Sequence, residues 1–136
     1  EKVEDLTEVM SIKFEMEFPI KASQKLLFQY ISTPSGLSEW FADNVNSRGE
    51  IFVFYWDGSD ESAKLLKKIN NEKIQFQWLD DEDTDYFFEL RLQFDEITKD
   101  VSLIVTDFAD DEDEVEESKL LWTNQIFDLK KVLGST

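Results

Sequence analysis

The sequence predicts an α+β fold in which a curved, six-stranded antiparallel sheet wraps around one long C-terminal helix. Three observations support this prediction. Residues 10–18 alternate between apolar and polar side chains, which is the period of a half-buried strand. Five further strand-like segments follow between residues 51 and 105 on short connections, a pattern typical of an antiparallel meander. Residues 111–133 carry an apolar stripe at helical spacing, and an apolar sheet face and an amphipathic helix bury themselves against each other.

The first strand, Met10–Phe18, is expected to end at Pro19, and two short helices follow it. Ser23 has the side chain of an N-cap, because its oxygen can accept a hydrogen bond from the first helical turn. Thr33 is the corresponding cap of the second helix, and Pro34 occupies its first position, where the missing N–H costs nothing. The chain therefore turns twice before the meander begins.

The five strands of the meander are separated by turn signals. The pairs Asp57-Gly58 and Asn70-Asn71 favour tight turns, and a further turn is expected near residues 98–100. Between the fourth and fifth strands of the whole sheet lies an acidic connection, residues 80–85. The apolar positions expected to face inward from the last three strands are Ile74, Phe76 and Trp78, then Phe88, Leu90 and Leu92, then Val101, Leu103 and Val105.

The last segment has the features of a complete helix. Acidic residues fill its first turns and Lys130 and Lys131 its last, which complements the helix dipole at both ends. Gly134 is a natural end. The apolar stripe that it is expected to bury is Val115, Trp122, Ile126, Leu129 and Leu133.

The composition excludes several classes of protein. The 136 residues include 31 Asp and Glu against 14 Lys and Arg, a formal net charge of −17, and neither Cys nor His. The missing residue types exclude disulfide scaffolds, Cys/His zinc sites, cysteine nucleophiles and Ser-His-Asp triads. With only two Pro and four Gly there is no candidate linker. We expect one domain over residues 1–136, with residues 1–8 as a flexible or extended lead-in, and neither a cofactor nor a metal.

The negative charge is concentrated in two segments. Residues 80–85 hold five acids and residues 110–117 hold seven, without a Lys or Arg in either. A chain with this charge repels phosphate backbones and anionic lipid, so nucleic-acid binding and membrane insertion are not expected. The two runs are interpreted as a solvated loop and a helix start, or alternatively as surfaces that steer a basic protein partner.

The first acidic run does not form a calcium loop. Asp81, Asp83 and Asp85 match the first, third and fifth positions of an EF-hand loop. However, Tyr86 stands where the loop requires Gly, and Leu92 stands where it requires Glu. The motif therefore fails, and only weak cation binding outside any motif stays open for the two runs.

No segment of the sequence predicts a membrane helix or a targeting signal. The longest apolar run, Ile51–Trp56, has six residues, against the ~20 that a membrane helix needs. The first residues are polar and acidic, unlike a signal peptide. We therefore expect a cytoplasmic location.

The order of elements and several motifs resemble the START-like (SRPBCC) superfamily, whose architecture is the helix grip. The resemblance extends over roughly residues 10–134 and is closest to the branch of Hsp90 ATPase activator homologues. The similar motifs are Ile20-Lys21-Ala22-Ser23, Leu27-Phe28-Gln29-Tyr30-Ile31, Thr33-Pro34, Leu37-Ser38-Glu39-Trp40-Phe41, the strand and turn of residues 49–58, Ile74-Gln75-Phe76-Gln77-Trp78, and the closing helix.

The resemblance implies an apolar cavity between the sheet and the long helix, used in that family for lipids and other hydrophobic ligands. Non-enzymatic binding of a small hydrophobic ligand or lipid is therefore the expected function. An acidic protein-interaction or chaperone-associated module without ligand is the alternative. A cyclase or hydrolase using Tyr, Asp or Glu is a third hypothesis, although the absence of His weakens its transfer from members that use an imidazole.

The aromatic side chains expected to face inward are the candidate cavity lining. As lining they would bind a ligand by burying apolar area, at about 25 cal/mol per Å². As core they would fill the space themselves, and both interpretations stay open. The polar candidates near the mouth are Tyr30, Asn44, Tyr55 and Tyr86. The candidate lining residues are Trp40, Phe41, Phe54, Trp56, Phe76, Trp78, Phe88, Leu90, Trp122 and Ile126.

Overall fold

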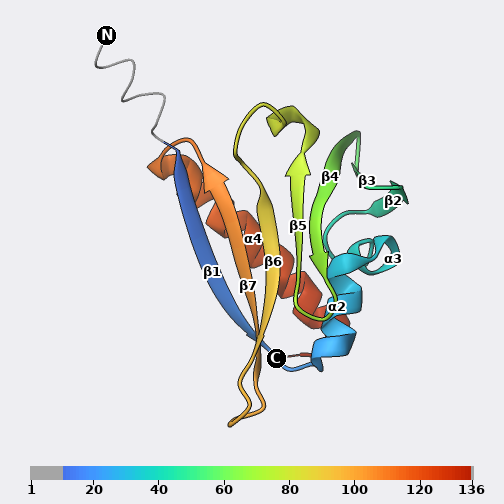
Figure 1. Ribbon diagram of the computed structural model, residues 1–136, viewed down its shortest axis with the longest axis vertical. Helices are drawn as coiled ribbons and strands as arrows, with labels where there is room; N and C mark the ends of the chain where they lie inside the picture. Colours follow the sequence, from blue (N-terminus) through green and yellow to red (C-terminus); the bar gives the residue numbers. More distant parts are fainter. Residues whose placement is uncertain (1–10, 136) are drawn as a thin grey trace.

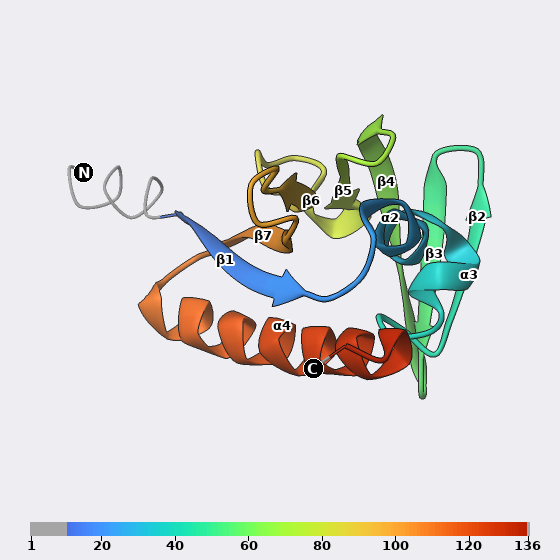
Figure 2. The same ribbon diagram turned by 90° about the horizontal axis from the view of Figure 1, so that it is seen from below.

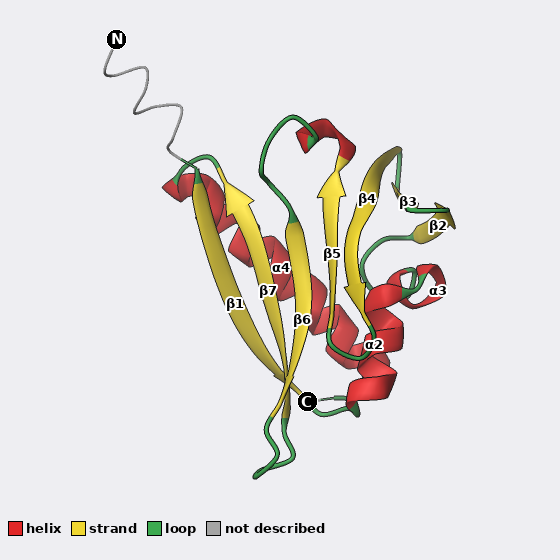
Figure 3. Cartoon of the chain, viewed as in Figure 1, coloured by secondary structure: helices red, strands yellow, loops and turns green. Residues whose placement is uncertain are grey.

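The computed structural model describes residues 11–135, in which an antiparallel sheet packs against one long helix (Figure 1). Figure 3 shows the order of the elements, with two short helices after the first strand and the long helix last. The strands are β1 (Ile12–Ile20), β2 (Asn44–Arg48), β3 (Ile51–Trp56), β4 (Ser59–Ile69), β5 (Lys73–Trp78), β6 (Phe88–Phe94) and β7 (Val101–Ala109). The helices are α2 (Gln24–Ser32), α3 (Pro34–Leu37) and α4 (Glu112–Leu133), with a short 3-10 turn η1 (Leu79–Asp81).

The predicted α+β class and the long C-terminal helix are confirmed, but the sheet has seven strands and not six. Its order is β1-β7-β6-β5-β4-β3-β2, and every neighbouring pair is antiparallel. The strands from β2 to β7 form a meander, and β1 closes the sheet beside β7. Figure 2 shows the strands in an arc with α4 on its inner side.

The strand that the sequence did not predict is β2. It pairs with β3 from Asn44 opposite Tyr55 to Arg48 opposite Ile51, across a turn in which Gly49 has a φ of 61°. Its only buried side chain is Val45, and the other four are exposed. A mostly polar edge strand shows no apolar alternation, so its pairing with β3 is what defines it.

The prediction that Pro19 ends the first strand is wrong. The strand continues through Pro19 to Ile20, and these residues stand opposite Ser102 and Val101 of β7. Because β1 is at the edge of the sheet, one row of its N–H groups has no partner strand, and proline is tolerated there. The expected start at residue 10 and the lead-in over residues 1–8 lie outside the described residues.

The predicted caps of the two short helices are confirmed. The Ser23 hydroxyl accepts a hydrogen bond from the Leu26 N–H at 3.1 Å, and the Thr33 hydroxyl accepts one from Gly36 at 3.0 Å. Pro34 occupies the first turn of α3. The spacing of Leu37, Trp40 and Phe41 predicts that all three form the apolar stripe of the second helix, and this is wrong for the last two. Because α3 ends at Leu37, Trp40 and Phe41 lie in the turns that follow it.

The ends of α4 also agree with the sequence. The Asp111 carboxylate accepts a hydrogen bond from the Glu114 N–H at 2.8 Å, and Gly134 has a left-handed φ of 71°. Within residues 11–135, no helix combines the length and apolar character that crossing a membrane requires.

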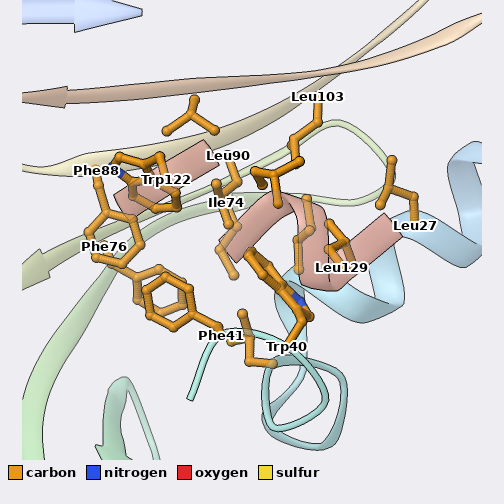
Figure 4. Packing of buried hydrophobic residues seen from close by; sticks show 14 of the residues in the cluster. Leu27, Trp40, Phe41, Ile74, Phe76, Phe88, Leu90, Leu103, Trp122 and Leu129 are labelled. Carbon is orange, nitrogen blue, oxygen red and sulfur yellow. The ribbon is translucent and has the colours of Figure 1, made fainter. Parts of the chain in front are cut away.

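The core lies between the inner face of the sheet and α4 (Figure 4). From α4 it contains Val115, Trp122, Ile126 and Leu129, four of the five residues of the predicted stripe. The fifth, Leu133, is partly buried against the same core. The predicted amphipathic face therefore contacts the apolar side of the sheet.

Candidate ligand-binding site

The structure brings all ten candidate lining residues into one apolar cluster, although they come from five separate parts of the chain. Eight are buried, whereas Trp56 and Trp78 are partly buried at its border. Whether any of them contacts a ligand stays a prediction. The cluster draws Trp40 and Phe41 from the turns after α3, Phe54 and Trp56 from β3, Phe76 and Trp78 from β5, Phe88 and Leu90 from β6, and Trp122 and Ile126 from α4.

Phe41 is at the centre of the aromatic packing. Five rings have their centroids 5.2 to 6.1 Å from the centroid of the Phe41 ring. This is the usual spacing of aromatic rings in direct contact. The space between β3, β6 and the Trp122 side of α4 is therefore occupied by the Phe41 side chain. The five surrounding rings are those of Trp40, Phe54, Trp56, Phe88 and Trp122.

A surface groove of about 580 Å³ opens beside this cluster, between the turns after α3 and the C-terminal half of α4. Its aromatic lining is Trp40, Phe41 and Trp56, and α4 contributes Gln125 and Val132 among others. The groove therefore reaches three of the ten candidate residues from the outside. We call it the α4 groove.

One carbonyl group holds the wall of the α4 groove in place. The Phe41 carbonyl accepts a hydrogen bond from Trp56 Nε1 at 3.2 Å and another from Gln125 Nε2 at 3.1 Å. The turn carrying Phe41 is thereby tied to both β3 and α4. The N–H groups of Trp56 and Gln125 are thereby used inside the protein, and the charged side chains of Glu39, Asp43, Asp128 and Lys131 also line the groove.

The polar side chains expected near the cavity mouth lie in different places. Asn44 and Tyr55 face each other across the β2–β3 pair and are both exposed. Tyr30 is partly buried, and its carbonyl accepts a hydrogen bond from Trp40 Nε1 at 2.8 Å. Tyr86 lies at the opposite end of α4 from the α4 groove, beside Asp110. The structure does not gather these four groups at one mouth.

Asp107 is an inward-facing carboxylate that the sequence prediction missed. It stands opposite Phe14 on the inner face of β7, and the Trp122 Nε1–H donates a hydrogen bond to its Oδ2 at 2.8 Å. Its Oδ1 accepts from the Phe108 N–H at 2.8 Å. Burial raises the pKa of the Asp107 carboxyl above its ordinary value, although both hydrogen bonds act to lower it. With both oxygens occupied, Asp107 positions the Trp122 ring.

The alternation of inward and outward positions along β7 could have predicted the position of Asp107. The sequence prediction followed the inward positions of this strand only to Val105, whereas the strand runs to Ala109. Extending the alternation by one step puts Asp107 on the inner face.

The two acidic runs meet at the N-terminal end of α4. A pocket of about 240 Å³ is formed there by acids of both runs and by aromatic side chains from two strands, β5 and β7, and the loop before β6. Tyr86 donates a hydrogen bond to Asp110 across this pocket. The lining contains no Lys or Arg, so its negative charges are uncompensated. The lining residues are Trp78, Asp81, Tyr86, Phe87, Asp107, Phe108, Asp110 and Glu114.

The pKa values in this pocket reflect the concentration of negative charge. The hydrogen bond to Asp110 is the largest cause that raises the pKa of Tyr86, to about 12. Partial burial raises the pKa of Asp81, and the charges of Asp80, Asp110 and Glu114 raise it further. Even so, no group of three or more acids among residues 11–135 has the geometry to hold a metal ion.

Comparison with known proteins establishes the family. A family model for the START-like superfamily domain matches residues 8–135. Because this match covers nearly the whole chain, the protein belongs to the START-like superfamily, as the motifs predicted. No curated protein matches the sequence.

Solved structures agree with this assignment. The solution structure of BfR322 from Bacteroides fragilis is 32% identical, with 92% of this chain and 93% of that one covered and a TM-score of 0.67. The Aha1 dimer from Colwellia psychrerythraea is 19% identical, with coverage of 90% and 96% and a TM-score of 0.75. MLL2253 from Mesorhizobium loti is 15% identical, with coverage of 90% and 97% and a TM-score of 0.74. The last two likenesses show the fold alone.

Proposed function

We propose that this protein binds a small hydrophobic molecule, without catalysing a reaction, at the α4 groove and the aromatic cluster behind it. The observation that carries the proposal is the position of Phe41. Its ring fills the space between the sheet and α4, yet it comes from a turn rather than from the sheet or the helix. Such a side chain can leave this space while the sheet and α4 keep their contacts elsewhere.

The proposed site combines a preformed opening with an apolar interior. The α4 groove already exposes parts of Trp40 and Trp56, and displacement of the Phe41 turn would join it to the cluster. A ligand that buries about 250 Å² of its apolar surface there would gain ~6 kcal/mol. The costs of association reduce this gain, so we expect affinities in the micromolar range or weaker.

A neutral fluorescent probe tests this function. N-phenyl-1-naphthylamine carries no charge, so the strong negative charge of the protein does not repel it, and its fluorescence rises in apolar surroundings. We expect saturable binding that Val132→Trp weakens, because Val132 lines the α4 groove and an indole at this position would fill it. Thr123→Trp is the matched control, since Thr123 is exposed on α4 and is not part of the groove lining.

Two outcomes would contradict the ligand-binding function. One is the absence of saturable probe binding to the wild-type protein. The other is equal probe affinity for Val132→Trp and Thr123→Trp. The second outcome would move the binding site away from the α4 groove.

A second candidate function, association with a basic protein, is favoured by the meeting of the two acidic runs around one end of α4. Their combined field would attract a positively charged partner and raise its association rate at low salt.

A further inference from the structure

The side of α4 that faces away from the sheet is unusually apolar in the middle of the helix. Three large side chains there are mostly in solvent: Leu120 is 63% exposed, Leu121 is 65% exposed and Phe127 is 60% exposed. We call these three residues the outer apolar patch. They add nothing to the core, which α4 contacts through its opposite stripe.

Helix geometry places Leu120 and Phe127 of the outer apolar patch on one side of α4, with Leu121 at its flank, about 100° from Leu120. Leu120 and Phe127 are seven residues apart, so at about 100° per residue they differ in direction by only about 20°. Trp122 of the buried stripe is about 200° from Leu120, which is nearly the opposite side of α4. The outward side of an amphipathic surface helix is normally polar. A group of exposed apolar side chains on that side marks an interaction surface.

The turns of α4 that precede the patch are acidic on the same outward side. Asp113, Glu116 and Glu117 are exposed, and we call them the outer acidic turn. None of the ion pairs within residues 11–135 involves these three carboxylates. At the other end of the patch, the Lys131 ammonium lies 5.2 Å from the centroid of the Phe127 ring. From N- to C-terminus, the outer face therefore changes from uncompensated negative charge to apolar surface.

The charge pattern of this face of α4 indicates which kind of partner can bind to it. A second copy of this chain would bring a net charge of −17 and the same acidic turn against this one. An anionic membrane is repelled for the same reason. A segment with Lys or Arg at one end and apolar side chains at the other matches both halves of the face. Opposite charges at the rim and apolar contact at the centre are the usual division of an interface.

We propose that the outer face of α4 binds a basic amphipathic segment of another protein. Apolar side chains of the segment pack on the outer apolar patch, and its Lys or Arg side chains face the outer acidic turn. This inference rests on the second candidate function, association with a basic protein, and is independent of ligand binding at the α4 groove. None of the three patch residues lines the α4 groove, although Lys131 borders both surfaces.

A designed peptide provides the test. The probe is a fluorescein-labelled 18-residue helix of Leu and Lys with one apolar face, and its binding is followed by fluorescence anisotropy. A peptide of the same charge with Ser in place of Leu shows what charge alone contributes. We expect Leu120→Ser combined with Phe127→Ser to weaken binding of the amphipathic peptide by roughly tenfold, because exposed anchors of this kind dominate small interfaces.

Matched charge variants locate the electrostatic half of the site. Asp113→Asn, Glu116→Gln and Glu117→Gln together should weaken binding several-fold at low salt, where screening is small. Glu82→Gln, Asp83→Asn and Asp85→Asn form the control. They remove the same charge from exposed positions of the other acidic run. All the substituted residues are exposed, so circular dichroism and thermal unfolding should show an intact fold.

The outcomes separate the site from the function. If the wild-type protein does not bind the amphipathic peptide, association with a basic partner itself fails. If the wild type binds the peptide but the patch variant binds it equally well, the function stands and the assigned face is wrong. The same conclusion follows if the control triple weakens binding as much as the acidic triple does. Self-association in sedimentation, abolished by the patch variant, would replace the basic segment by a second copy. Binding to phosphatidylglycerol vesicles that the patch variant abolishes would replace it by a membrane.

Discussion

Replacing Phe41 by alanine tests the packing on which the ligand-binding proposal depends. The Phe41 ring is buried and has five rings around it. Its removal leaves a void of up to about 100 Å³, which at about 24 cal/mol per Å³ costs ~2.4 kcal/mol. The lost transfer of the ring carbons adds ~2 kcal/mol. We expect the free energy of unfolding, measured by urea titration, to fall by about 4 kcal/mol.

The same variant should also gain binding. Its void adjoins the α4 groove, so N-phenyl-1-naphthylamine should bind to Phe41→Ala more tightly than to the wild type. Phe28→Ala is the control, because Phe28 is also buried but lies on α2 outside the groove lining. It should lose a similar stability without gaining affinity for the probe.

Two results would refute this reasoning. A loss below about 1 kcal/mol for Phe41→Ala, with cooperative unfolding retained, would mean that the ring is not packed as described. Equal gains in probe affinity for the two alanine variants would mean that any core void binds the probe, and that the α4 groove has no special role.

Three further predictions concern Asp107, Tyr86 and Gly36. Trp122→Phe removes the hydrogen bond to Asp107, so the pKa of that carboxyl should rise further. The stability loss, about 1–2 kcal/mol near neutral pH, should shrink as pH falls toward 3.8, because the folded-state carboxyl, whose pKa is raised, then becomes protonated in both the wild type and the variant. Equal losses in urea titrations at about pH 7 and about pH 4 would contradict this. Spectrophotometric titration should show that Tyr86 has a pKa of about 12, and Asp110→Asn should return this pKa toward 10.0. An unchanged titration curve for Asp110→Asn would mean that the hydrogen bond to Asp110 is not the cause of the raised pKa. Gly36→Ala should lower the free energy of unfolding by about 1–3 kcal/mol, because a Cβ there overlaps the backbone of α2. If the variant instead unfolds at the same temperature as the wild type, α2 and α3 can move apart at little cost.

Features that depend on neighbours along the chain were predictable. The caps at Ser23 and Thr33 and the left-handed Gly134 follow from local hydrogen bonding and backbone geometry, and the structure agrees. The α4 stripe followed from helical spacing. The aromatic candidates on the strands were predictable as one inward-facing set because strand alternation assigns each of them to a face.

Features that depend on a distant partner were missed. The polar strand β2 is recognisable only beside β3. Pro19 is tolerated because β1 is at the edge, and its position beside β7 is set by the closure of the sheet. Asp107 is acceptable on the inner face because Trp122 of α4 reaches it. The contribution of Phe41 was foreseen, but its central position among five rings was not, because turns have no period to follow.

By itself, the sequence determined six of the seven strands, the long helix and which face of each is apolar, since these are properties of short segments. Only the tertiary structure decided that residues 80–85 and 110–117 share one pocket, that a turn residue fills the space under α4, and that Leu120, Leu121 and Phe127 are left in solvent. The physical reason is that a sheet and a helix associate so as to bury their largest apolar faces. Which loops meet, and which apolar residues stay uncovered, follows from that association and not from any local pattern.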